Sequence, residues 1–121
     1  MPETAVLIYR EADGTAPLLE WLGEQEREPR EKCVAALALL GEWGHELRRP
    51  HVENLGGGLY ELRVKVGRAN FRMLYFFHGR SAVVVTHGFT KERKIPPEEI
   101  TRAEERRRRF EAVPEHHCYS L

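Results

Sequence analysis

The sequence contains few of the residues that characterise disulfide-rich or membrane-spanning proteins. It has two cysteines among 121 residues, Cys33 and Cys118, and their spacing matches neither a zinc site nor a dense disulfide framework. No apolar run reaches the roughly 18 residues of a membrane-spanning helix, and no basic segment followed by an apolar one begins the chain. We therefore expect a soluble, cytoplasmic protein with two free thiols and no membrane contact.

Motifs of several enzyme classes are also missing. The chain has no serine nucleophile elbow, no phosphate-binding glycine loop and no paired-cysteine motif. The neighbouring side chains of His116 and His117 cannot comfortably ligate one ion in an extended segment, and no carboxylate or cysteine lies at a recognised ligand spacing from them. We therefore expect neither a metal site nor a cofactor.

Positive and negative charges balance over the whole chain, but positive charge is in excess within one segment of it. The formal net charge is zero. Residues 1–61 hold 12 acidic and 6 basic side chains, whereas residues 62–94 hold 8 basic side chains and a single acidic one. Because like charges at this density repel one another across strands, the basic segment indicates binding to a polyanion or to an acidic partner. The pattern does not distinguish RNA from an acidic protein.

Hydrophobic periodicity predicts one α+β domain over residues 1–121, and a hydrophobic content of 41% suits one modest core. Alternating or β-branched apolar residues predict strands over residues 5–9, 59–66, 70–77 and 81–88. Apolar spacings of three and four residues predict helices over residues 15–26, 29–43 and 96–110. Residues 45–58 contain Pro50 and three successive glycines, and we expect them to form a loop.

The predicted order is an N-terminal strand, a helical hairpin, an antiparallel meander and a C-terminal helix, with the helices on one face of the sheet. We expect the tail, residues 112–121, to be mobile. Four successive arginines, residues 106–109, lie on the last helix, where carboxylates precede three arginines by the four residues that favour helical ion pairs. These pairs are Glu98–Arg102, Glu104–Arg108 and Glu105–Arg109. We therefore interpret this element as a salt-bridged surface helix rather than a nucleic-acid-binding patch.

The candidate binding residues lie on the meander. Arg63, Lys65 and Arg72 fall on predicted strands beside aromatic residues, which is typical of a surface that follows phosphates and stacks bases. A solvated face is the alternative interpretation. His87 ends the third strand of the meander. An imidazole titrates near neutral pH and suits proton transfer, although a lone histidine is also compatible with a structural role.

Four runs of sequence resemble one protein family when their order and spacing are taken together. They are GLYELRV at residues 58–64, ANFRMLY at residues 69–75, THGFTK at residues 86–91 and PPEEI at residues 96–100. This succession is similar to that of the RelE/HigB superfamily of toxins, and specifically of its phage-derived HigB-like branch. The resemblance covers about residues 5–110 and implies a RelE-like, microbial ribonuclease-like fold.

The resemblance implies the toxin of a type II toxin–antitoxin system, which binds in the ribosomal decoding site and cleaves messenger RNA there. It also implies an antitoxin partner, usually a helix-turn-helix protein, that covers the active face. The implied reaction needs no metal, because the ribose 2′-hydroxyl attacks the adjacent phosphate while basic side chains move protons and stabilise the added charge. The alternatives are a gyrase inhibitor of the ParE type, which uses the same fold without RNA cleavage, and an inactive toxin.

By this resemblance, the catalytic residues are Arg72, His87 and Lys91. We expect Arg72 to stabilise the pentacoordinate phosphorane, His87 to act as the base, and Lys91 to donate a proton or stabilise charge. The residues expected to hold RNA phosphates are Arg63, Lys65, Arg68, Arg93 and Lys94.

Overall fold

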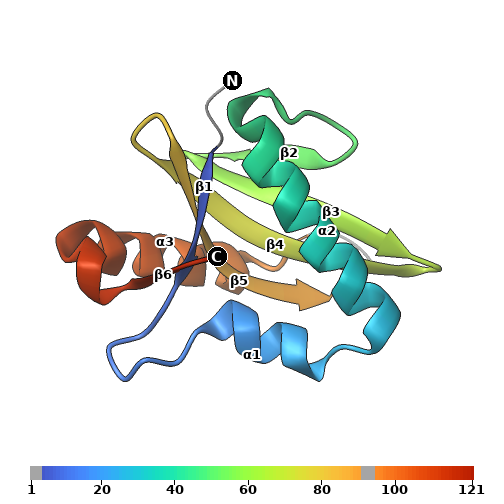
Figure 1. Cartoon of the computed structure of the whole chain (residues 1–121), viewed down its shortest axis with the longest axis horizontal. Helices are drawn as coiled ribbons and strands as arrows, with labels where there is room; N and C mark the ends of the chain where they lie inside the picture. Colours follow the sequence, from blue (N-terminus) through green and yellow to red (C-terminus); the bar gives the residue numbers. More distant parts are fainter. Residues whose placement is uncertain (1–3, 91–94) are drawn as a thin grey trace.

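The computed structural model describes residues 4–90 and 95–121, which form a six-stranded sheet with three α-helices (Figure 1). The strands are β1 (Ala5–Tyr9), β2 (Val52–Gly56), β3 (Leu59–Val66), β4 (Ala69–His78), β5 (Ala82–Thr90) and β6 (Cys118–Ser120). The helices are α1 (Pro17–Glu24), α2 (Arg27–Trp43) and α3 (Pro97–Ala112), and the 3-10 turns η1 (Gly44–Glu46) and η2 (Pro114–His116) follow α2 and α3. Among the described residues, no helix is long and apolar enough to cross a membrane. The predicted α+β class and RelE-like arrangement are confirmed.

The sheet combines the predicted meander with the two ends of the chain. The strand order is β2-β3-β4-β5-β1-β6. Neighbouring strands from β2 to β5 are antiparallel. By contrast, β1 lies parallel to β5, with Ala5 opposite Ala82, and β6 pairs antiparallel with β1. The first and last strands therefore adjoin at one side of the sheet.

The helices cover both faces of the sheet. Figure 1 shows α2 in front of the sheet and α3 behind it. In β4, Met73 and Tyr75 belong to the core beneath α1 and α2, whereas Leu74 and Phe76 belong to the core beneath α3, together with Phe110. The prediction that all helices share one face is wrong, because β4 carries large apolar side chains on both faces and each face needs a cover.

Two short strands form where the sequence predicts a loop and a mobile tail. β2 lies within the predicted loop and pairs with β3, while β6 lies within the predicted tail and pairs with β1. The tail has further contacts, since Nδ1 of His117 lies 2.9 Å from the carbonyl oxygen of Arg10 and its ring stacks on Tyr9. Both strands are too short to show a period of their own, and they form because a longer strand offers them hydrogen-bonding partners.

A β-bulge in β5 decides which way His87 points. Leu74 lies opposite His87 and Tyr75 lies opposite Val85, so Thr86 has no partner on β4. Without the extra residue, strand alternation places His87 on the same face as Val85, beneath α1 and α2. With the bulge, His87 shares the α3 face with Leu74. The hydroxyl of Thr86 donates a hydrogen bond to the carbonyl oxygen of Leu74 at 3.3 Å, which fixes the bulge.

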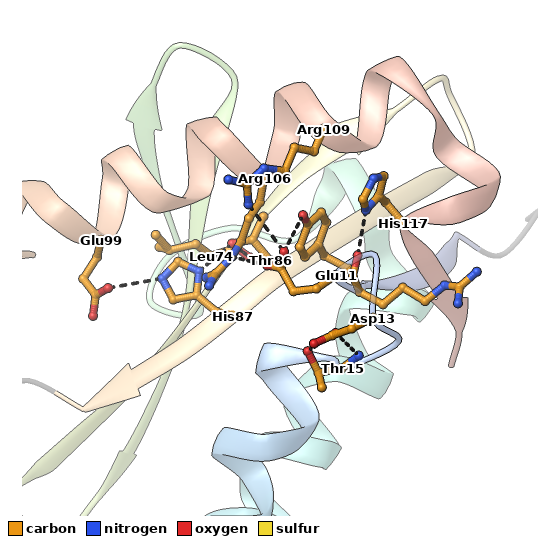
Figure 2. Close-up of polar contacts among 12 residues, drawn as sticks. Glu11, Asp13, Thr15, Leu74, Thr86, His87, Glu99, Arg106, Arg109 and His117 are labelled. Atoms are coloured by element: carbon orange, nitrogen blue, oxygen red, sulfur yellow. Dashed lines mark hydrogen bonds and ion pairs between the residues drawn. The ribbon is translucent and has the colours of Figure 1, made fainter.

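The ion pairs of α3 differ from the predicted ones. Arg102 pairs with Glu99 at 2.7 Å, while Arg106 and Arg109 each lie 3.4 Å from the carboxylate of Glu11 in the loop after β1 (Figure 2). All six residues of the three predicted pairs are described by the structure, and none of those pairs forms there. Arg106 and Arg109 therefore connect α3 by charge to the β1–α1 loop, whereas Arg107 pairs within α3 with Glu111 at 3.5 Å.

Candidate functional site

A basic cavity of about 420 Å³ opens at the edge of β3. Arg63 and Lys65 from β3 and Arg72 from β4 line this basic cavity. The other lining residues are Pro50, His51, Val64, Asn70 and Phe71. The meander therefore brings three of the residues predicted from the sequence to one place.

The basic cavity exists because β2 pairs with only part of β3. The pairing ends where Val52 lies opposite Leu62, and within the described chain no strand lies beside the later residues of β3 on that side. The loop before β2 occupies the gap, since the backbone N–H of Arg63 donates to the carbonyl oxygen of His51 at 2.8 Å. A loop rather than a strand thus forms one wall of the cavity and leaves it open to solvent.

The two arginines of the basic cavity share one buried carboxylate. Arg63 and Arg72 lie directly opposite each other on β3 and β4, and their side chains are 43% and 12% exposed. Glu61 is fully buried beside them. Its Oε1 accepts a hydrogen bond from Nε of Arg63 at 2.6 Å, and its Oε2 lies 3.3 Å from Nη1 of Arg72. Two cations are therefore held next to each other by one anion.

His87 lies apart from the basic cavity. It is opposite Leu74 and belongs to the cross-strand row of Glu61, whereas Arg72 lies two rows further along, opposite Phe89. His87 instead lines a second cavity of about 260 Å³ between α1, the end of β5 and α3. The structure thus brings Arg63, Lys65 and Arg72 together, but it does not bring His87 into the same cavity.

The imidazole of His87 is buried and neutral. The residue is 5% exposed, its Nδ1 lies 2.9 Å from the hydroxyl of Thr86, and its Nε2 lies 3.4 Å from Oε1 of Glu99 (Figure 2). The pKa of His87 is lowered from 6.5 to about 3, mainly by burial and in part by the positive charges of Arg106 and Arg102. The contact with Glu99 is therefore not an ion pair at neutral pH. The expectation that His87 titrates near neutral pH is wrong.

This burial predicts a pH dependence of stability. In the unfolded chain His87 takes up a proton near pH 6.5, whereas in the folded protein it does so only near pH 3. The free energy of unfolding should therefore fall as the pH drops from about 6.5 toward 3, by up to about 1.4 kcal/mol per pH unit for this one proton. Urea unfolding at pH 7, 6 and 5 measures the slope.

The matched variant is His87→Gln, because glutamine never becomes charged. Its stability should depend on pH less steeply than that of the wild type over the same range. An equal stability slope in the two proteins would contradict the burial of a neutral imidazole.

The remaining predicted residues have different positions. Arg68 is exposed in the turn between β3 and β4. Lys91, Arg93 and Lys94 lie outside the described residues. Arg68 therefore lies on the hairpin that carries the basic cavity, and the predicted roles of Lys91, Arg93 and Lys94 stay predictions.

Three polar residues of the site, His51, Glu61 and Asn70, are absent from the sequence-based predictions of site residues. Glu61 precedes Arg63 by two positions on a strand and so shares its face, which is a usable signal for an acid among the cations. Asn70 lies opposite Lys65, as the register of the hairpin requires. His51 has no comparable signal, because its position depends on where β2 stops pairing.

The site residues suit charge chemistry at phosphate groups. Among the described residues, no group of three or more histidine, cysteine or carboxylate side chains could hold a metal ion. Both cysteines are free, as predicted, and burial raises the pKa of the Cys33 thiol to about 11, which makes it a poor nucleophile. By contrast, arginine is always protonated and presents several N–H donors to an anion. The basic cavity can therefore bind a phosphodiester and stabilise negative charge that develops on it.

One known protein family matches most of this chain. The family described as "Phage derived protein Gp49-like (DUF891)" matches residues 20–108, which include the second half of α1, all of α2, the whole meander and most of α3. No curated protein matches the chain. The match covers well over half of the chain and all the strands that build the basic cavity. The chain therefore belongs to the Gp49-like family, a RelE/HigB-like family of toxins from toxin–antitoxin systems.

Proposed function

We propose that the protein is a ribosome-dependent messenger-RNA endoribonuclease of the HigB-like branch, the toxin of a type II toxin–antitoxin module in the cytoplasm. The observation that carries the proposal is the basic cavity, where Arg63, Lys65 and Arg72 surround a space of about 420 Å³. RNA presents one negative charge per nucleotide, and a set of cations around a small space suits its backbone.

The three cations divide the work of binding and catalysis. The side chain of Arg72 is 12% exposed and is in contact with Glu61, so its charge is fixed before the substrate arrives. A fixed charge of this kind is suited to stabilise the pentacoordinate phosphorane. Arg63 and Lys65 are more exposed. We assign Arg63 to a flanking phosphate, and Lys65 both to phosphate contact and to proton transfer. Arg68, in the adjacent turn, extends the same basic surface.

Proton transfer is assigned to lysine rather than to His87. His87 is buried, neutral and outside the basic cavity, so it has no path to the 2′-hydroxyl or to the leaving 5′-oxygen. Lys65 lines the cavity, and a protonated ammonium can donate directly to the leaving oxygen. By family resemblance, Lys91 as the neutral amine takes the proton of the attacking 2′-hydroxyl, so that one lysine accepts a proton and the other donates one. His87 then supports the site through its packing between β5 and α3.

An antitoxin is the partner that this family implies, and we propose that it covers the basic cavity. Residues 62–94 carry the excess of positive charge, so a partner that offers carboxylates associates faster with this surface. Covering Arg63 and Arg72 also blocks access of RNA. The resemblance to the HigB-like branch favours a helix-turn-helix protein in this role.

The test of the proposed function compares RNA on and off the ribosome. Induction of the protein alone should stop growth through translation, and transcripts in a translating extract should be cut within codons. The same purified transcript without ribosomes should be cut slowly, because a small site relies on the ribosome to orient the 2′-hydroxyl for attack in line with the leaving group. Primer extension locates the cuts in both reactions.

Two results would contradict this function. Rapid metal-dependent cleavage of free RNA would indicate a different class of nuclease. Growth arrest with intact transcripts and damaged DNA would indicate a gyrase inhibitor of the ParE type.

A further inference from the structure

Glu61 is a carboxylate in the interior of the protein. It lies in β3 and is 0% exposed. Charged side chains are almost never fully buried unless they are paired, because removal from water disfavours the charge. Its side chain lies on the α3 face of the sheet, the face of Arg63, since residues two apart on a strand share a face. The neighbours of Glu61 must therefore explain its burial.

Each oxygen of Glu61 contacts a different arginine. Oε1 accepts a short hydrogen bond, 2.6 Å, from Nε of Arg63. Oε2 lies 3.3 Å from Nη1 of Arg72, an ion-pair distance, but it accepts no hydrogen bond within the described residues. The contact with Arg63 is thus directional, whereas the contact with Arg72 is mainly electrostatic and leaves the donors of Arg72 available to a ligand.

The carboxylate of Glu61 offsets the repulsion between the two arginines. Arg63 and Arg72 are direct cross-strand neighbours, and like charges in that position repel each other. A second carboxylate, Glu53, lies 3.8 Å from Nη1 of Arg63, but it is bound more closely by Arg49 at 2.6 Å. Glu61 is therefore the anion that touches both arginines.

We propose that Glu61 is a positioning residue for the basic cavity. Its carboxylate holds one edge of each guanidinium, so that the remaining N–H groups of Arg72 point to the scissile phosphodiester and those of Arg63 to the phosphate beside it. Glu61 does not touch the RNA; it acts through the arginines. The consequence for cleavage rests on the proposed ribonuclease function, whereas the orientation of the arginines is a property of the free protein.

The first arm of the test needs no RNA substrate. In wild-type protein the Nε–H proton of Arg63 should exchange slowly with water and give a distinct NMR signal, because Glu61 accepts its hydrogen bond. Glu61→Gln should speed this exchange about tenfold or more, since a charge-assisted hydrogen bond is lost. The matched control is Glu31→Gln, which removes an exposed carboxylate bound to Arg27 at 2.9 Å on α2 and should leave the Arg63 signal unchanged.

The second arm measures binding and turnover separately. Inorganic phosphate should bind Glu61→Gln at least as tightly as wild type, because a negative charge near the cavity has gone. Single-turnover cleavage on ribosomes at saturating enzyme should nevertheless fall about tenfold, since misdirected arginines lower kcat rather than raise KM. Glu61→Asp keeps the charge and should have a rate between those of wild type and Glu61→Gln. It also replaces Glu61→Gln if that variant does not fold.

The outcomes separate the proposal from the function on which it depends. Unchanged Arg63 exchange together with unchanged cleavage in Glu61→Gln would overturn the positioning role. A fall in phosphate affinity equal to the fall in rate would also overturn it, because Glu61 would then maintain the shape of the whole cavity. If wild-type protein cleaves no RNA, the ribonuclease function is wrong, and the NMR arm alone decides whether Glu61 orients the arginines.

Discussion

Replacement of Arg72 by alanine is expected to lower the single-turnover rate of transcript cleavage about a hundredfold or more, the usual scale for losing one preorganised charge stabiliser. The guanidinium of Arg72 lines the basic cavity and its side chain is only 12% exposed, so its charge is already in place when RNA arrives. Binding to the ribosome should change much less, because Arg63 and Lys65 remain. Cleavage at saturating protein and a separate ribosome-binding titration measure the two effects.

A second variant and a control make this result specific. Arg72→Ala leaves Oε2 of the buried Glu61 without its cation, so the variant's unfolding must be measured beside its rate. Arg72→Lys retains a positive charge and should still lose most of the activity, because an ammonium cannot reproduce the planar donor fork of arginine. Arg80→Ala removes an exposed cation from the turn between β4 and β5 and should cleave like wild type. Equal rates for Arg72→Ala and Arg80→Ala would remove Arg72 from the mechanism.

Truncation of Phe110 to alanine is expected to lower the free energy of unfolding by about 3–5 kcal/mol. Phe110 is 1% exposed, and its ring packs edge-on against Phe76 and His78, with ring centroids 5.7 Å and 4.9 Å apart. Phe110 is the large α3 side chain in the core between α3 and the sheet. The other fully buried residue of α3 is Ala103. Ala103 is too small to fill the space left by the ring.

Urea unfolding at pH 7 measures the loss. The control is Val34→Ala on α2, where the side chain is 50% exposed and the expected change is within about 0.5 kcal/mol. A loss below about 1 kcal/mol for Phe110→Ala would mean that α3 is held to the sheet mainly by its ion pairs with Glu11, since large-to-small core changes typically exceed that value.

Helices and strands with a clear hydrophobic periodicity could be predicted from the sequence. The strand predicted over residues 59–66 is β3, and the helix predicted over residues 29–43 is α2 with two more residues at its start. The short strands β2 and β6 could not be predicted, because their backbone hydrogen bonds are set by the strands beside them. The placement of α3 on the second face likewise depends on both faces of β4 being apolar, a property of the sheet rather than of the helix.

The site was predictable only as far as residues on one strand determine it. Arg63 and Lys65 are two positions apart, so a strand places them on one face, and the hairpin brings Arg72 opposite Arg63. The position of His87 depends on the bulge at Thr86, an irregularity in the pairing of β4 with β5 that no count along β5 reveals. Burial of Glu61 and His87 depends on packing from other elements. The residue types alone therefore could not show that Glu61 lies in the interior or that His87 does not titrate near neutral pH.

The position of β1 between β5 and β6 has a consequence for the synthesis of the chain. Ala5 lies opposite Ala82, and Ile8 lies opposite Tyr119, so both neighbours of the first strand are made late. Contacts between such distant residues form slowly, because a long loop must close before any of them can stabilise the chain. Until then both edges of β1 have open hydrogen-bonding groups, which are a template for pairing with another chain. Completion of this sheet is therefore a late event in synthesis, and the interval before it is when self-association has its best opportunity.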